Sequence, residues 1–251
     1  MDLESLKKEF SNPASTYRLA PFWFLNHELE DSELTWQINE MNRKGVGGFI
    51  LHPRHGLITP YLSEEWMNRM DTCIKEADKL RMKAYLYDEN NWPSGPVDGE
   101  LIEKYPDYNM SGCFLSQEWI VQGGKRLKEQ IDFVDGLIAI VAVPVGRGKR
   151  LEGLPQSAVS LVEFLNDKTL DWTAPAGSKW QVMVFTRKFL KPYGFFGGYL
   201  DTLSRQAVAK FIEMTHEKYA ERFADYFGGT VDGIFTDEPA MSYNPDPAVP
   251  W

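Results

Sequence analysis

Short apolar segments alternate with helical segments along this chain, and this alternation constrains the fold more than any other feature. The apolar segments predict strands over residues 21–25, 48–51, 83–87 and 231–236. Apolar residues recur at steps of three and four in three further segments, which predicts helices over residues 32–44, 63–80 and 204–227. Alternating strands and helices with right-handed crossovers form a parallel sheet, so we expect an α/β fold.

The residues at the strand ends favour a barrel over a doubly wound sheet. Polar side chains capable of chemistry follow the four strands: Asn26, His52 with Arg54, Asp88 with Glu89, and Asp237 with Glu238. Active sites of (β/α)₈ barrels lie at the C-terminal ends of the strands. No glycine-rich loop follows the first strand, as a dinucleotide-binding sheet would require. The sequence therefore predicts a partial (β/α)₈ barrel of about four βα units.

A β-rich segment interrupts the alternation after the third strand. Residues 137–145 are apolar and β-branched, and residues 158–164 and 180–189 are further candidate strands. We therefore expect three divisions: barrel units one to three over residues 1–105, a β-rich insertion over 106–198, and the fourth unit with the start of the next loop over 199–251. Because a closed barrel needs eight strands, we expect an N-terminal part of a longer enzyme that is inactive by itself.

Charge and composition exclude several classes of partner. The formal net charge of −9 argues against nucleic acid, whose phosphates need a basic surface, but it is compatible with a neutral sugar. No apolar run approaches the ~18 residues of a membrane span, and the first residues lack the pattern of a signal peptide. The two cysteines have no metal-binding spacing. We expect a cytoplasmic protein, with its oligomeric state left open.

Two pairs of adjacent carboxylates are the strongest candidates for catalysis. Hydrolysis of a glycosidic bond uses two carboxyl groups, of which one protonates the leaving oxygen. The chain offers Asp88 with Glu89 and Asp237 with Glu238. Neighbouring residues of a strand point to opposite faces, so one member of each pair is expected to face the barrel interior. An Asp-Glu pair before proline also occurs at solvated strand ends, and spacing alone does not decide between the two.

Two histidines after the second strand raise the question of a metal. His52 and His55 could bind a transition metal together with Asp88, which would make the chain a metal-dependent barrel hydrolase. No further His or Cys follows at a useful spacing, so no metal is predicted. Arg54 and His55 are expected to donate hydrogen bonds to sugar hydroxyls, whereas His52 is at least as well explained as a packed histidine.

Tryptophans at the strand ends are candidates for stacking on a sugar ring. Trp23 and Trp92 lie at or just after strands. The expected substrate-binding set consists of these two residues and Asn26, His52, Arg54, His55 and Asp88. Trp36 and Trp66 lie on predicted helices and are expected in the core.

Several of these motifs resemble one family of enzymes. Residues 21–26, 45–49, 61–66 and 88–95 resemble the start of the barrel in the α-L-rhamnosidase-like glycoside hydrolases, family 106 and its relatives. Residues 171–180 resemble their inserted β segment, and Phe235-Thr236-Asp237-Glu238-Pro239 resembles their fourth-strand motif. Proteins of this family are far longer than this chain. The resemblance implies hydrolysis of O-glycosidic bonds in a glycan such as a rhamnoside, with inversion and a bound calcium ion.

The fourth-strand motif also suggests roles for its carboxylates. Barrel hydrolases of the broader clan carry Asn-Glu-Pro at this place, with the Glu as acid/base, and this chain has Asp237 in place of the Asn. The resemblance therefore implies that Glu238 is the general acid, with Asp237 and Glu89 as the other catalytic candidates. The alternatives are a non-catalytic carbohydrate-binding remnant and the metal-dependent hydrolase.

Overall fold

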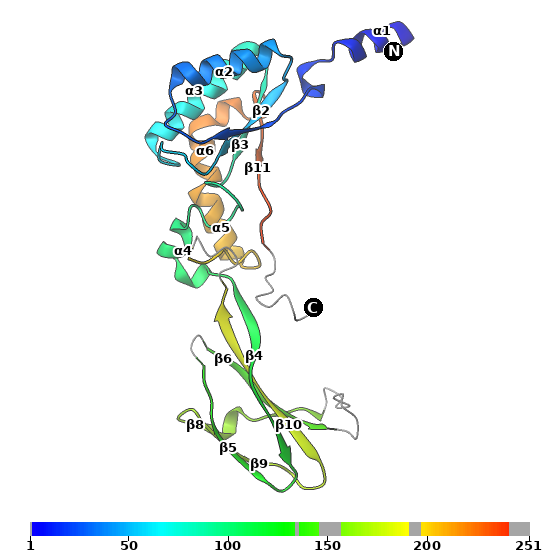
Figure 1. The fold of residues 1–251 in the computed structure, drawn as a ribbon, viewed down its shortest axis with the longest axis vertical. Helices are drawn as coiled ribbons and strands as arrows, with labels where there is room; N and C mark the ends of the chain where they lie inside the picture. The colour runs from blue at the N-terminus through cyan, green and yellow to red at the C-terminus, as the bar shows by residue number, and fades with distance from the viewer. Residues whose placement is uncertain (1, 134–135, 146–156, 191–196, 241–251) are drawn as a thin grey trace. The chain divides into compact units, whose positions relative to one another are not determined.

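The computed structural model describes residues 2–133, 136–145, 157–190 and 197–240, which form a mixed α/β structure with several sheets. The chain divides into two compact units (Figure 1). Unit 1 comprises Met1–Asn109 and Lys191–Trp251, and unit 2 comprises Met110–Leu190. Within the described residues, no helix combines the length and apolar character needed to cross a membrane.

Unit 1 is built on a sheet of four parallel strands. In spatial order these are β1 (Phe22–Leu25), β2 (Gly48–Pro53), β3 (Lys83–Tyr87) and β11 (Val231–Phe235). All four predicted strands are confirmed, but β2 runs on to Pro53 and therefore contains His52. The spatial order follows the chain without reversal, so this sheet lacks the switch point at which doubly wound sheets bind ligands.

Helices cover one face of this sheet. Figure 1 shows α2 (Asp31–Arg43), α3 (Glu64–Leu80) and α6 (His216–Phe223) beside the strands. Apolar side chains of these helices share one core with alternate strand residues such as Leu25, Leu51 and Leu86. Trp66 is fully buried in this core, as predicted, and so is Cys73. Trp36 is 59% exposed, so the prediction that it lies in the core is wrong.

The long helix predicted over residues 204–227 is two helices instead. Helix α5 (Arg205–Met214) ends before Thr215, and α6 begins at His216. Thr215 has φ −122° and ψ −73°, outside the helical region, and its hydroxyl donates to the Phe211 carbonyl at 2.8 Å. This bond provides the Phe211 carbonyl at the end of α5 with a side-chain donor.

Several short elements in unit 1 were not predicted from the sequence. The helices are α1 (Leu3–Ser11) and α4 (Glu100–Lys104). Single 3₁₀ turns lie at Ser15–Tyr17, Pro106–Tyr108 and Ala224–Tyr226. Helix α1 has Leu3, Leu6 and Phe10 at helical spacing, so a periodic signal was present, although all three side chains are exposed in the structure.

Unit 2 consists of two antiparallel sheets. One contains β4 (Ser111–Gln122), β10 (Lys179–Phe189), β6 (Leu137–Val145) and β7 (Val159–Ser160). The other contains β5 (Arg126–Gln130), β9 (Thr169–Thr173) and β8 (Leu165–Asn166), and a 3₁₀ turn lies at Val162–Phe164. Side chains from both sheets form a single core that includes Trp172 and Val184.

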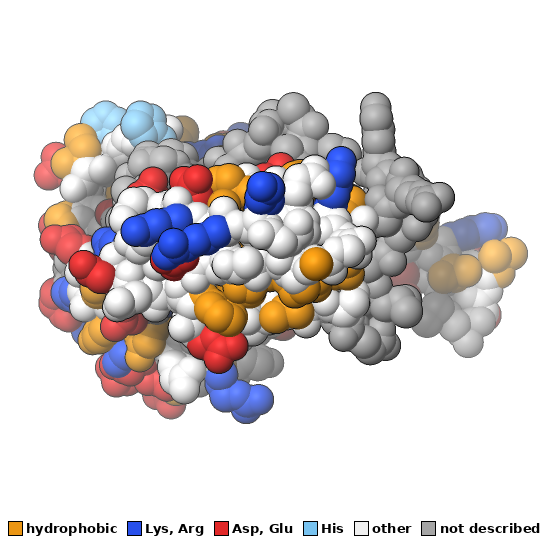
Figure 2. Space-filling model, turned by 90° about the horizontal axis from the view of Figure 1, so that it is seen from below, with side chains coloured by type: hydrophobic (Ala, Val, Ile, Leu, Met, Phe, Trp, Pro, Cys, Tyr) orange, Lys and Arg blue, Asp and Glu red, His pale blue; other side chains and the backbone are white. Residues whose placement is uncertain are grey.

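One face of the molecule carries both acidic and basic side chains (Figure 2). On the face shown in Figure 2, lysine and arginine side chains are spread out and interleaved with acidic, polar and hydrophobic ones. Arg126 and Asp171 form one exposed ion pair.

Candidate active site

An open cavity of about 330 Å³ lies at the C-terminal ends of the strands of unit 1. It is lined by Phe22, Phe24, His52, Arg54, Trp92, Asp237 and Glu238. The last five residues of this set were expected from the sequence, and the structure brings them together from β2, the loop after β3 and the end of β11. The volume of the cavity falls within the range of roughly 300–1,000 Å³ that is typical of small-molecule binding sites.

Phe22 and Phe24 were not predicted as cavity residues, because Trp23, which lies on the opposite face of β1, was chosen as the candidate for sugar stacking. Trp23 packs edge-on against Phe49 and donates to Gln37 Oε1 at 2.8 Å, so its ring faces the helices. Side chains alternate along a strand, and Phe22 and Phe24 therefore face the other way. They are 40% and 50% exposed, so their rings are available to a ligand. The alternation of β1 was the signal that could have found them.

Aromatic rings lie side by side across the sheet face opposite the helices. The register pairs Phe24 with His52 and Tyr87 with Phe235. The His52 and Tyr87 rings stack with their centroids 3.8 Å apart, and Phe22 meets Phe235 edge to face at 4.8 Å. Aromatic rings from all four strands therefore share this face of the sheet.

Both carboxylates of the fourth-strand motif line the cavity. Asp237 Oδ2 accepts a hydrogen bond of 2.8 Å from the Tyr87 hydroxyl, and Glu238 Oε2 accepts one of 3.0 Å from Trp92 Nε1. The prediction that one of this pair would point away is wrong, because the strand ends at Phe235 and alternation stops there. Glu238 has φ +41°, a left-handed conformation that costs energy for a residue with a side chain.

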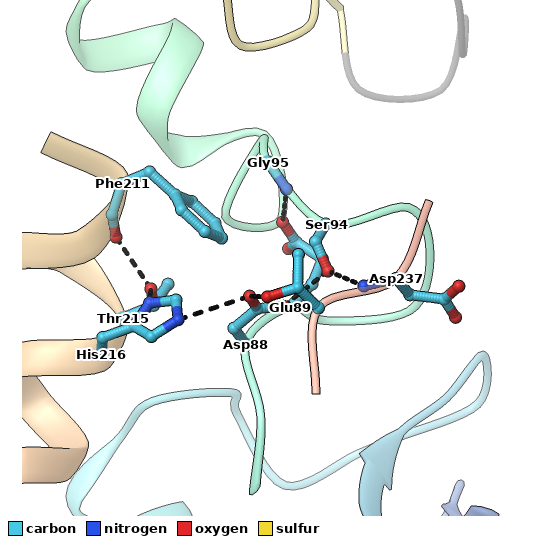
Figure 3. A network of polar contacts seen from close by, with 9 residues as sticks. Asp88, Glu89, Ser94, Gly95, Phe211, Thr215, His216 and Asp237 are labelled. Atoms are coloured by element: carbon cyan, nitrogen blue, oxygen red, sulfur yellow. Dashed lines mark hydrogen bonds and ion pairs between the residues drawn. The ribbon is translucent and has the colours of Figure 1, made fainter. Parts of the chain in front are cut away.

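A buried hydrogen-bond network holds the backbone of this motif in place (Figure 3). The Ser94 N–H donates to the Asp237 carbonyl at 2.8 Å, and the Asp237 N–H donates to Ser94 Oγ at 2.9 Å. Asp88 accepts from the hydroxyls of Ser94 at 2.5 Å and Thr236 at 2.6 Å. Asp88 is fully buried and does not line the cavity, so it contacts the segment that carries the carboxylates and not the space beside them.

His216 joins the same network from the helix side. Its Nε2 lies 3.6 Å from Asp88 Oδ2, and its Nδ1 lies 2.9 Å from the hydroxyl of Thr215, where the helix breaks (Figure 3). Burial lowers the pKa of His216, an effect that the nearby Asp88 carboxylate opposes. Burial likewise raises the pKa of Asp88, whereas the hydrogen bonds that Asp88 accepts from Ser94 and Thr236 lower it. The sequence offered no argument about His216, because only the break at Thr215 aims it at Asp88.

Glu89 organises the loop that follows β3. Its side chain is fully buried, and its two oxygens accept hydrogen bonds of 2.6 to 3.0 Å from four backbone N–H groups, those of Asn90, Gly95, Val97 and Asp98. Val97 and Asp98 have φ +53° and +56°, so the carboxylate supports a strained loop. Glu89 does not line the cavity. Burial raises the pKa of Glu89 to about 8, although the four N–H groups act in the opposite direction.

The raised pKa of Glu89 predicts a pH dependence of stability. Above its ordinary value of 4.5 the unfolded chain loses this proton, whereas the folded protein keeps it until about pH 8. The folded state therefore binds more protons in this window, and its stability should fall as pH rises from about 4.5 to about 8. Glu89→Gln cannot ionise at this position, so denaturant unfolding at several pH values should show a steeper decline in the wild type than in the variant, where the raised pKa of Asp88 still contributes. Parallel curves would contradict the assignment.

The remaining predicted residues lie at the edges of the cavity or apart from it. Trp23 and Asn26 line a separate cavity of about 90 Å³. His55 lines a further cavity together with Arg54 and Trp92. His52 Nδ1 lies 2.7 Å from the Pro53 carbonyl, which can only accept, so the proton is assigned to Nδ1. Burial lowers the pKa of His52.

The described residues were also searched for a metal site. Within them, no three His, Cys, Asp or Glu side chains come together as a metal would require. Calcium takes six to eight oxygen ligands. The described side chains of the main cavity offer the carboxylates of Asp237 and Glu238, each already bound to an aromatic donor, and do not by themselves fit that ion.

Comparison with known proteins relates this fold to a glycoside hydrolase. The chain is similar in structure to a rhamnosidase from Novosphingobium sp. PP1Y, with a TM-score of 0.64 and 14% sequence identity. The similarity covers 92% of this chain and 39% of that chain, so this chain spans well under half the length of the rhamnosidase. No protein-family model matches the sequence. No curated protein sequence matches it either. The fold is therefore like that of a glycoside hydrolase.

Proposed function

We propose that this chain forms part of the active site of a glycoside hydrolase that acts on a glycan, with an α-L-rhamnoside as the first candidate substrate. One observation carries the proposal: two carboxylates, Asp237 and Glu238, end a parallel strand and face an open cavity walled by aromatic rings. The likeness to a rhamnosidase fold supports it. The four-stranded sheet is then part of a (β/α)₈ barrel, whose interior is the aromatic face.

In this proposal Glu238 is the general acid and Asp237 is held beside it. Glu238 has the longer side chain of the two and reaches further over the cavity. The hydrogen bond from Trp92 Nε1 leaves Glu238 Oε1 for the glycosidic oxygen, to which the protonated group would give its proton as the bond to the anomeric carbon breaks. Asp237, oriented by the Tyr87 hydroxyl, is placed to accept a hydrogen bond from a sugar hydroxyl.

A panel of aryl glycosides tests the proposal. The full-length protein should release the aryl alcohol from the glycoside of at least one sugar. The Glu238→Ala variant is the negative control for each substrate. Sugar binding by calorimetry without any turnover would instead favour a carbohydrate-binding protein. Turnover that Glu238→Ala leaves intact would place the chemistry elsewhere.

Trp92 should contribute measurably to substrate binding. Its ring lines the cavity, and its Nε1 orients Glu238. Trp92→Ala should weaken substrate binding by about 1 kcal/mol or somewhat more, the scale of an aromatic contact. The matched control is Trp36→Ala, which removes an exposed tryptophan from α2. A Trp92→Ala protein with unchanged KM and a lower melting temperature would mean that Trp92 only supports the fold.

A further inference from the structure

A second cavity adjoins the proposed active site. It has a volume of about 450 Å³ and is lined by Arg54, His55, Asn91 and Trp92. Arg54 and Trp92 also line the first cavity, so the two spaces share a wall. A ligand that fills the first cavity and passes Trp92 would enter the second. The two volumes together are large enough for a substrate of more than one sugar residue.

Backbone hydrogen bonds build this second cavity from two separate loops. The Asn91 N–H donates to the Pro53 carbonyl at 3.1 Å, and the Arg54 N–H donates to the Leu25 carbonyl at 2.9 Å. Asn91 has φ +73°, a conformation that the tightly bound loop after β3 imposes. Arg54 and Asn91 are therefore held beside each other before any ligand arrives.

Arg54 gives this cavity a positive charge, which favours a ligand with a negative charge. Its guanidinium is half-buried and lies 5.2 Å from the centre of the Phe24 ring. In the part of the chain that the structure describes, it forms no ion pair with an acidic side chain. Asp237 and Glu238 line the first cavity with it, but their hydrogen bonds go to Tyr87 and Trp92.

The chemistry of arginine indicates which group would complement it. A guanidinium stays charged at all ordinary pH values and presents paired N–H donors that match both oxygens of a carboxylate. The chain has a net charge of −9, so general attraction of anions to its surface is not expected. A carboxylate drawn to Arg54 would therefore be recognised by local geometry, with Asn91 and His55 available to its neighbouring hydroxyls.

We propose that the second cavity binds a carboxylate-bearing sugar, a uronic acid residue, next to the sugar whose bond is cleaved beside Glu238. The carboxylate pairs with Arg54, and the sugar ring lies against Trp92. The substrate is then an acidic glycan. This inference rests on the proposed function for its account of cleavage, but the binding of a uronic acid can be measured without turnover.

Binding of matched ligands tests the inference on the full-length protein. Disaccharides of galacturonic acid and of glucuronic acid are compared with their methyl esters by calorimetry, since esterification removes the charge and adds one methyl group. At least one free acid should bind about tenfold to a hundredfold more tightly than its ester, the scale of a hydrogen bond to a charged group. Arg54→Gln should abolish this preference, and Arg54→Lys should keep part of it as a point charge. Arg43→Gln removes an exposed arginine from the end of α2 and should change nothing.

The outcomes separate this inference from the proposed function. Equal binding of acid and ester in the wild type, or a preference that survives Arg54→Gln, would overturn the uronic acid site. Hydrolysis of neutral aryl glycosides without an acid preference would retain the glycosidase and reject the acidic substrate. An acid preference without any hydrolysis would retain the binding site and reject the glycosidase. Melting temperatures of the Arg54 variants within a few degrees of the wild type would show that lost binding is not lost folding.

Discussion

Glu238→Gln should reduce turnover of a glycoside with a poor leaving group by roughly a hundredfold or more, the usual scale for a positioned proton donor. The glutamine keeps nearly the same shape, and its carbonyl oxygen can still accept the hydrogen bond that Trp92 Nε1 now donates at 3.0 Å. The substitution therefore removes the transferable proton and little else. An activated aryl leaving group departs without a proton, so its hydrolysis should fall much less.

The comparison of the two leaving groups identifies the role of Glu238. Steady-state kcat/KM is measured for both substrates on the full-length protein. Glu221→Gln, an exposed carboxylate on α6, provides the matched control and should leave both values unchanged. Equal losses on both substrates would point to a nucleophile, a base or a binding group, and the assignment of Glu238 as the acid would be wrong.

Glu89→Ala should cost about 3 to 5 kcal/mol of unfolding free energy, because each buried N–H group left without an acceptor costs about 1 to 3 kcal/mol. The change leaves four buried or partly buried N–H groups without the carboxylate that accepts from them now. It also removes the support of the left-handed residues Val97 and Asp98. Denaturant titration measures the loss.

The same substitution should reach the proposed active site through the loop. Trp92 and Ser94 lie in the segment that Glu89 holds, and Ser94 is bonded to the backbone of Asp237. Activity should therefore fall together with stability. Glu103→Ala removes an exposed carboxylate from α4 and should change stability by no more than about 0.5 kcal/mol. A Glu89→Ala protein as stable as this control would refute the structural role of Glu89.

The two Asp-Glu pairs show that spacing in a sequence can identify candidate carboxylates but does not predict which of them face a cavity. Both pairs follow an apolar strand, and as sequence patterns they are equivalent. In the structure Asp237 and Glu238 face the cavity, whereas Asp88 and Glu89 are fully buried. The difference comes from the segments that follow. The loop after β3 folds back and presents backbone N–H groups and a serine hydroxyl to its own carboxylates.

Local periodicity was enough to predict the regular part of unit 1. The four parallel strands and helices α2 and α3 have apolar residues at the spacing that burial against one sheet requires, and each was predicted from that spacing. The strand ends also identified His52, Arg54, Trp92, Asp237 and Glu238 as neighbours, because parallel strands bring their C-terminal ends to one edge.

Only the tertiary structure decided which face of each segment meets the cavity and which residues hold it. Trp23 faces the helices while Phe22 and Phe24 face the cavity, because the sheet covers its core with one set of alternating side chains. His216 reaches Asp88 because the helix breaks at Thr215, and Tyr87 orients Asp237 across 150 residues of chain. Contacts of this kind join segments far apart in sequence, so they depend on how strands and loops pack together and leave no local periodicity from which they could be predicted.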